Sequence, residues 1–159
     1  MLASKLLVVV GLFMMANYAA VNGRCWKNGH STEATPHPLW SQWQDKCYKM
    51  HDANVTWEEG KQICVELGGV MVVPQSEVEL QHLHNMCSCN WLRIGCNDIK
   101  TEGSWVCLDD EGTIDVQDKR WNDAQPNNYG NQDCAAINAS GWHDGDCGTK
   151  RKLICQRPV

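Results

Sequence analysis

The sequence is poor in basic residues. It has 14 lysines and arginines against 19 aspartates and glutamates, for a formal net charge of −5, and its basic residues form no cluster. Such a chain has no electrostatic footprint for nucleic acid or for an anionic membrane surface. It also has no serine or cysteine nucleophile with an evident base and no pair of catalytic carboxylates, so we expect no enzymatic activity.

Long apolar runs are also scarce. One follows Lys5, from Leu6 to Ala16, and it is too short to span a bilayer. A basic residue, an apolar run and then small residues up to Gly23 are typical of a secretory signal peptide, so we expect residues 1–23 to be one. We therefore expect a secreted, extracellular protein without a membrane span. The rest of the chain shows no internal repeat and suits one domain.

Cysteine, in contrast, is abundant: all ten cysteines lie after residue 23. An even number behind a signal peptide indicates disulfide bonds before metal thiolates. The run with His82, His84, Cys87 and Cys89 could alternatively supply four nitrogen and sulfur ligands to zinc, although an oxidising compartment favours disulfides. Spacing alone does not give the connectivity.

Local patterns predict a mixture of helices and strands. Residues 24–36 have no apolar period and are expected to form an irregular arm. Thr56 with Glu59 forms a capping box that starts a helix, and Ser76 with Glu79 repeats it. Beyond Cys89, short apolar runs alternate with Gly, Asn and Asp turns, which indicates strands and long loops.

The stretch 121–155 is rich in hard oxygen donors. Amides and carboxylates surround Pro126 and lie between Cys134 and Cys147, among several glycines. Ca²⁺ takes six to eight oxygen ligands in a flexible cage, so this composition suits a calcium site. The alternative is a polar surface loop, because Asn, Gly and Asp also favour turns.

The order of the pieces resembles a C-type lectin domain. The long-loop half carries Gln-Pro-Asn at 125–127, an acidic residue before Cys134, an aromatic-X-Asp at 142–144, and a final Cys155 after an apolar pair. The runs KCY at 46–48 and WLRIG at 91–95 resemble core strands of that family. The resemblance covers residues 37–157. It implies an α+β fold with two helices flanking two small antiparallel sheets, a long loop region and many disulfides.

The resemblance also implies a disulfide framework. The expected pairs are Cys64–Cys155, Cys134–Cys147, Cys96–Cys107 and Cys25–Cys47. Cys87 and Cys89 are left over. They could link two chains into a disulfide-bonded dimer, or exchange places with Cys25 and Cys47.

In that family, five residues hold a principal Ca²⁺ and also hydrogen-bond a sugar. Carried over by position, the set here is Gln125, Asn127, Gln132, His143 and Asp144. Gln-Pro-Asn is neither the mannose-type Glu-Pro-Asn nor the galactose-type Gln-Pro-Asp, Gln132 replaces the usual Glu, and His143 replaces the usual Asn. Gln125, Asn127 and Asp144 would then form a weak calcium site, because one carboxylate gives little charge.

A neighbouring second calcium site in the family matches better. The positions that correspond to it are Asp98, Glu102, Asn128 and Asp133, with three carboxylates and one amide. An ion there could order the loop without touching sugar. The alternative is that Asp98 and Glu102 only close turns.

The resemblance therefore predicts a secreted lectin that binds a carbohydrate or glycoprotein at the long loop, with weak or partial dependence on Ca²⁺. The alternative is a module that has lost ion and sugar and recognises a protein or a surface. Two sequons make Asn54 and Asn138 candidate glycan sites, and a glycan on Asn138 would be expected to crowd the ion site. Trp121 and Trp142 flank the loop and could stack on a sugar ring.

Overall fold

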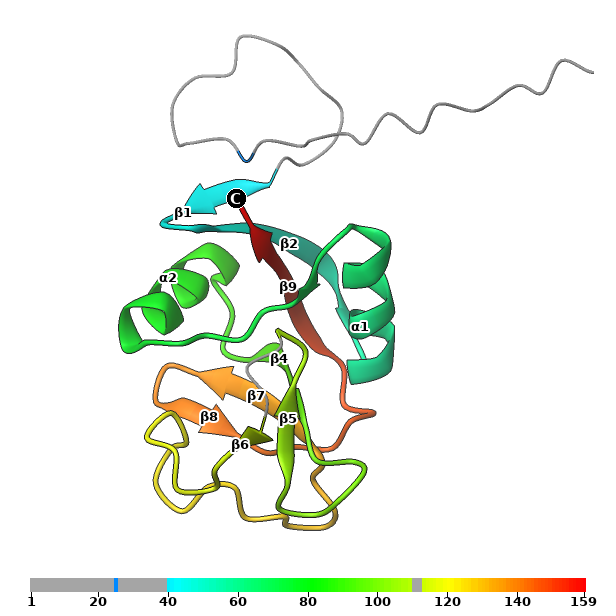
Figure 1. The fold of residues 1–159 in the computed structure, drawn as a ribbon. Helices are drawn as coiled ribbons and strands as arrows, with labels where there is room; N and C mark the ends of the chain where they lie inside the picture. The colour runs from blue at the N-terminus through cyan, green and yellow to red at the C-terminus, as the bar shows by residue number, and fades with distance from the viewer. Residues whose placement is uncertain (1–24, 26–39, 110–112) are drawn as a thin grey trace, which may run out of the picture.

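The computed structural model describes Cys25, residues 40–109 and residues 113–159 (Figure 1). The predicted signal peptide and, apart from Cys25, the predicted arm lie outside the described residues. In chain order the elements are β1 (Ser41–Trp43), β2 (Lys46–Val55), α1 (Trp57–Glu66), β3 (Val70–Met71), α2 (Glu77–Cys87), β4 (Leu92–Asn97), β5 (Trp105–Cys107), β6 (Thr113–Ile114), β7 (Cys134–Asn138), β8 (Gly141–His143) and β9 (Arg151–Pro158).

The two helices begin where their capping residues predict. The Thr56 side chain accepts from the Glu59 backbone N–H at 3.3 Å, and the Glu59 carboxylate accepts from the Thr56 N–H at 2.8 Å. Ser76 likewise accepts from the Glu79 N–H at 3.2 Å. The second box is only half formed, however, because the Glu79 carboxylate accepts from other donors. The first cap is therefore purely local, and the second is shared with tertiary structure.

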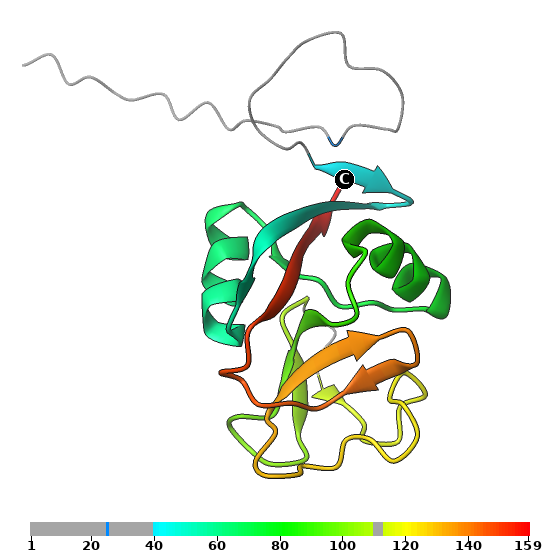
Figure 2. The same cartoon turned by 180° about the vertical axis from the view of Figure 1, so that it is seen from behind.

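The long antiparallel pair of β2 and β9 is the spine of the sheet, running from Lys46↔Pro158 to Val55↔Arg151 with one irregularity. The helices lie on either side of this pair, as Figures 1 and 2 show from opposite directions. β1 and β3 extend this group, and β4 to β8 form a second antiparallel group. The predicted α+β fold is confirmed. The two expected sheets are joined into one, because β4 pairs in parallel with β9 at Leu92↔Lys152 and Arg93↔Leu153.

All ten cysteines are paired. The four predicted bonds are present, with Cα–Cα distances of 5.8 Å for Cys25–Cys47, 5.3 Å for Cys64–Cys155, 4.1 Å for Cys96–Cys107 and 5.0 Å for Cys134–Cys147. The two leftover cysteines, Cys87 and Cys89, pair with each other across two positions. In this arrangement neither sulfur links a second chain or holds zinc.

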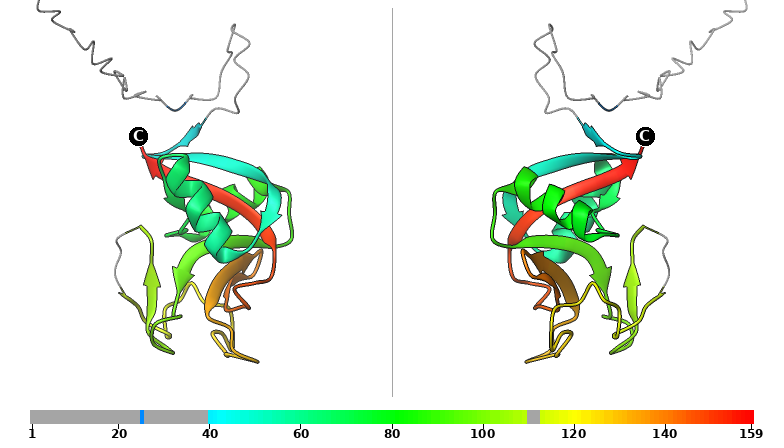
Figure 3. Two further views of the ribbon diagram at one scale, coloured as in Figure 1. Left: turned by 90° about the vertical axis from the view of Figure 1, so that its right-hand side faces the viewer. Right: turned by 90° about the vertical axis from the view of Figure 1, so that its left-hand side faces the viewer.

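The irregular loops gather at the end of the molecule away from the C-terminus. Figure 3 shows this end from two sides, below the second group of strands. The segment between β6 and β7 contributes most of it, and the turn between β4 and β5 lies beside it (Figure 1). The candidate site residues come from these loops.

Candidate functional site

The long loop enters and leaves the fold through buried tryptophans. Trp121 forms a bridge with Trp142, the Asn122 N–H donates to the Trp142 carbonyl at 2.9 Å, and the Trp142 N–H donates to the Arg120 carbonyl at 2.8 Å. Trp142 is 0% exposed and Trp121 is 7% exposed. The suggestion that either ring stacks on a sugar is therefore wrong, since both rings pack in the core and anchor the loop.

The carboxylate of Asp144 organises the tip of the loop. Its Oδ2 accepts hydrogen bonds from the backbone N–H groups of Asn127, at 2.8 Å, and Asn128. Its own N–H lies 3.4 Å from the accepting Oε1 of Gln125, and the Gln125–Pro126 peptide bond is cis. Asp144 is 7% exposed, and its Oδ1 is buried without a hydrogen-bond partner among the described residues. The loop is thus closed by one buried carboxylate on two backbone amides.

The remaining members of the first predicted set bond within the chain. Asn127 Oδ1 accepts from the Tyr129 N–H at 2.9 Å. The Gln132 N–H donates to Oδ1 of Asn128, and Nε2 of His143 lies 3.3 Å from Nδ2 of Asn122. Burial lowers the pKa of His143, and the nearby Asp144 opposes this shift.

The first set therefore fits a calcium ion poorly. Oxygens of Gln125 and Asn127 are turned toward backbone N–H groups, and Asp144 supplies the single carboxylate. Low ligand charge and an imidazole nitrogen both disfavour a hard cation. Gln125 and Asn127 lie around Asp144, and apart from its carboxylate the set offers neutral hydrogen-bonding groups.

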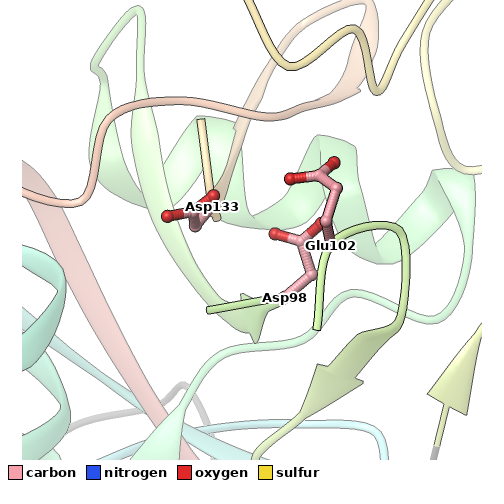
Figure 4. A group of neighbouring side chains, drawn as sticks. All are labelled: Asp98, Glu102 and Asp133. Carbon is pink, nitrogen blue, oxygen red and sulfur yellow. The ribbon is translucent and has the colours of Figure 1, made fainter. Parts of the chain in front are cut away.

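The second predicted set forms a compact acidic cluster. Ligand atoms of Asp98, Glu102 and Asp133 all lie within 4.8 Å of one another, and Figure 4 shows the three carboxylates facing a common space. The Asp98 N–H donates to the Asp133 carbonyl at 3.1 Å, which holds the turn after β4 against the end of the long loop. Three carboxylates at this spacing suit Ca²⁺.

Asp98 is the buried member of this acidic cluster. It is 2% exposed; its Oδ2 accepts from the Gly103 N–H at 2.9 Å, and its Oδ1 has no hydrogen-bond partner among the described residues. Burial raises the pKa of Asp98, the Gly103 hydrogen bond opposes this, and Glu102 and Asp133 raise the pKa further. A cation would satisfy the bare oxygen and relieve the repulsion, so the residues present fit Ca²⁺.

Asn128, the fourth predicted member, accepts from the Gln132 N–H at 2.7 Å through its Oδ1. A neighbour that the sequence did not single out, Asn131, donates from Nδ2 to Asp133 Oδ2 at 2.8 Å. Its backbone has a positive φ of 69°. Asn tolerates that conformation, so an Asn after a Gly, two residues before an acidic residue, is the signal that could have found it.

Tyr129 was also missed. Its side chain is 86% exposed, beside the amides of the loop tip. The Trp91 ring, in contrast, is in contact with neighbouring side chains. The Arg151 guanidinium lies 4.5 Å from its centroid, and the His143 ring lies nearly perpendicular to it with the centroids 5.0 Å apart. Tyr129 is thus the aromatic ring that this loop presents to solvent within the described residues.

The two sequons lie in different surroundings. Asn54 is exposed near the end of β2. Asn138 ends β7, and its Oδ1 accepts from the Ser140 N–H at 2.8 Å and the Ser140 hydroxyl at 2.6 Å. Cys134 begins the same strand, next to Asp133 of the acidic cluster, so Asn138 lies roughly 13 Å along the strand from it. Asn138 is adjacent to the loop in sequence but at the far end of the strand in space.

The comparisons with known proteins agree with this fold. The family model described as the lectin C-type domain matches residues 53–157. Over 124 residues the chain is 32% identical to C-type lectin domain family 4 member M of Symphalangus syndactylus. This aligned stretch covers 76% of this chain and 29% of the relative. The chain thus spans less than a third of that relative's length.

Solved structures show the same architecture. The mouse scavenger receptor C-type lectin carbohydrate-recognition domain aligns with a TM-score of 0.67 and 29% identity, over 79% of this chain and 96% of that one. A calcium-independent type II antifreeze protein shares the fold with a TM-score of 0.66 and 22% identity, over 82% of this chain and 98% of that one.

Two helices beside an open sheet, five disulfides and a long loop ending in an acidic cluster define a C-type lectin-like module. With the match of the family model over residues 53–157, the chain belongs to the C-type lectin domain family. In the part of the chain that the structure describes, no helix is long and apolar enough to cross a membrane.

Proposed function

We propose that this protein is a secreted lectin that binds a carbohydrate or glycoprotein at the long loop, near Gln125, Asn127 and Asp144, and catalyses no reaction. We further propose that its dependence on Ca²⁺ is weak or partial. The observation that carries the proposal is the cluster of Asp98, Glu102 and Asp133, whose carboxylates lie within 4.8 Å at the foot of that loop.

Calcium and sugar act at different points of the loop in this proposal. The acidic cluster would hold the ion, which neutralises the carboxylates and fixes the segment up to Asp133. The chain's own amides would bind the sugar. With Oδ1 of Asn127 engaged by the Tyr129 N–H, its Nδ2 is left to donate to a sugar hydroxyl. Ca²⁺ then helps binding through loop order, so its removal weakens binding without abolishing it.

The test is a glycan array with the mature protein in millimolar Ca²⁺ and in EDTA, joined to calorimetric titration of Ca²⁺. We expect EDTA to lower glycan binding severalfold and Glu102→Gln to weaken Ca²⁺ binding by about tenfold, since ligand charge sets affinity. Asp144→Ala should remove glycan binding and leave Ca²⁺ binding intact. Glu58→Gln, an exposed carboxylate on α1, is the matched control. Absence of glycan binding in millimolar Ca²⁺ contradicts the proposal.

A second candidate is a lectin-like module that recognises a protein or a surface. The engaged oxygens of Gln125 and Asn127 and the exposed Tyr129 ring favour it, because the loop then offers fewer free acceptors and an aromatic contact surface. Glycan binding that EDTA reduces and Ca²⁺ restores would rule it out.

A further inference from the structure

Arg93 is a charged residue in the interior of the fold. It is the second residue of β4, opposite Ala136 on β7 and beside Leu153 on β9, and it is 0% exposed. Buried charges are normally paired with an opposite charge. Among the described residues, no carboxylate lies within ion-pair distance of its guanidinium.

The two terminal nitrogens of the guanidinium donate to backbone carbonyls instead, and its buried Nε has no hydrogen-bond partner among the described residues. Nη1 donates to the Cys134 carbonyl at 3.4 Å, and Nη2 donates to the carbonyls of Asp146, at 3.0 Å, and Thr149. Burial, followed by the nearby Arg151, lowers the pKa of Arg93 to about 10, and Asp146 opposes this shift. Arg93 therefore stays protonated at neutral pH, as a fixed cation surrounded by carbonyl oxygens.

The carbonyls of Asp146 and Thr149 belong to the segment that carries the loop-closing carboxylate. Residues 144–150 connect β8 to β9 without a helix or strand of their own. The Cys134 N–H donates to the Gly145 carbonyl at 3.0 Å, and the Asp146 side chain accepts from the Thr149 N–H at 2.9 Å. Asp144 opens this segment, so fixing the segment also fixes the acceptor that holds the backbone of Asn127.

We infer that Arg93 is a positioning residue for the long loop, a built-in cation that gathers the carbonyls of the 144–150 segment and so keeps Asp144 in place when no Ca²⁺ is bound. A guanidinium offers five N–H donors in a rigid fork, which can order several carbonyls at once. The inference rests on the proposed function for what the loop binds, but what it predicts is the order of the loop itself.

With Arg93 in this role, the loop tip needs only one carboxylate. An ion at the tip would otherwise draw neighbouring oxygens together. Here the Oδ2 of Asp144 instead holds the tip by accepting from two backbone N–H groups, and Arg93 draws together the carbonyl oxygens of the segment behind it. The ligand-binding end of the loop is therefore expected to remain formed in a chelator.

The test is amide hydrogen exchange in EDTA, read at the backbone amides of Asn127 and Asn128. Arg93→Met keeps the unbranched apolar stem and removes the charge and the donors. We expect exchange at these two amides to rise about tenfold or more, with exchange in the β2–β9 pair unchanged, because opening is local. Arg157→Met removes a guanidinium stacked on Trp40 at the far end of β9 and should leave both amides as in wild type.

Wild-type exchange at Asn127 and Asn128 in a folded Arg93→Met protein would overturn the inference, as would a uniform rise that includes the β2–β9 amides. If Arg93→Met does not fold, Arg93→Lys decides. A single ammonium cannot hold all the carbonyls in the guanidinium geometry, so we expect faster exchange at the two amides, and wild-type exchange would overturn the inference. Selective loss of protection without any glycan binding would reject only the proposed lectin function.

Discussion

The hydroxyl of Tyr48 donates a hydrogen bond at 2.7 Å to the carboxylate of Glu79, 31 residues further along the chain. The same carboxylate accepts from Lys46 Nζ at 3.0 Å and from the Gln75 N–H at 2.8 Å. Burial and this contact with Glu79 raise the pKa of Tyr48, so the hydroxyl stays a donor at all ordinary pH values. The group fastens the start of α2 to β2.

Removing this carboxylate should be costly. Glu79 is 3% exposed, so Glu79→Ala leaves a buried hydroxyl and the Gln75 N–H without an acceptor, and we expect the free energy of unfolding to fall by ~2–4 kcal/mol. Tyr48→Phe should cost ~1–2 kcal/mol. Urea unfolding at pH 7 measures both. Glu77→Ala, an exposed neighbour on the same helix, is the control, and an equal loss there would show that Glu79 is not special.

Stability without calcium should depend on pH through Asp98. Its raised pKa means that the fold favours the protonated form. The stability it contributes is present below the unfolded-state pKa, about 3.9, and is lost as pH rises through the folded-state pKa. Asp98→Asn should therefore raise the free energy of unfolding in EDTA at pH 7 by ~1 kcal/mol, with no gain near pH 3.5.

Thermal unfolding in EDTA between pH 3.5 and pH 7 checks this prediction, and adding Ca²⁺ supplies the control. Wild type should then gain stability by mass action, whereas Asp98→Asn should gain little. A wild-type protein that is more stable than Asp98→Asn in EDTA, by a margin that grows with pH, would contradict it.

The pair of capping boxes shows what local sequence can predict. The box of Thr56 and Glu59 involves neighbours in the chain, and it forms as the pattern indicates. The box of Ser76 and Glu79 has the same pattern, but Tyr48 and Lys46 capture the glutamate from another strand. Its other carboxylate oxygen accepts from the Gln75 N–H, one position before the cap. Tyr48 and Lys46 are distant in sequence, so their part in this difference is not visible in a local pattern.

In the candidate site, too, some features could be predicted from the sequence and others could not. Asp98 and Asp133 lie far apart in the chain, and only the family resemblance brought them together before the structure did. The sequence did not show which aromatic side chains are buried. Trp142 was expected to be available to a ligand and lies in the core, whereas Tyr129 was not singled out and is exposed. The pairing of Cys87 with Cys89 was likewise open, because spacing permits several partners.

The disulfides should differ in their effect on stability. Loop-closure entropy predicts ~4–5 kcal/mol for Cys64–Cys155, which spans 91 residues, and only ~1–2 kcal/mol for Cys87–Cys89, which spans two. Replacing both cysteines of each pair by serine, followed by urea unfolding, tests the order. A comparable loss for the two pairs would contradict it.

On a non-reducing gel we expect wild type to run as a monomer, because all ten cysteines are paired within the chain.

Expression in a secreting eukaryotic cell should add a glycan at Asn138 as well as at Asn54. At Asn138, the Ser140 bonds to Oδ1 leave Nδ2 available, and a hollow of about 500 Å³ lined by Trp91 and Asn138 lies beside it. Intact mass is measured before and after enzymatic deglycosylation. The mass lost should be smaller by one glycan in Asn138→Gln, and likewise in Asn54→Gln, than in wild type. An unchanged mass would refute the site concerned. Because Asn138 is at the far end of β7, we expect Asn138→Gln to leave ligand binding unchanged.

The exposed ring of Tyr129 should contribute to ligand binding and not to folding. Its backbone is fixed, since its N–H donates to Asn127 Oδ1 at 2.9 Å, while its side chain is 86% exposed. Stacking of an aromatic ring on the apolar face of a sugar contributes ~1 kcal/mol, so Tyr129→Ala should weaken glycan binding by roughly fivefold to tenfold without lowering the melting temperature. Tyr129→Phe keeps the ring and should bind nearly as well as wild type.

Glycan titration, paired with a thermal melt of each variant, separates contact from folding. Trp142→Ala would lose binding too, but it empties a fully buried site and should lower the melting temperature sharply, which marks its effect as structural. If Tyr129→Ala binds as wild type does while Asp144→Ala does not bind, the sugar is held by the loop amides alone. If neither change affects binding, the ligand lies away from this loop, and the exposed ring then has no part in recognising it.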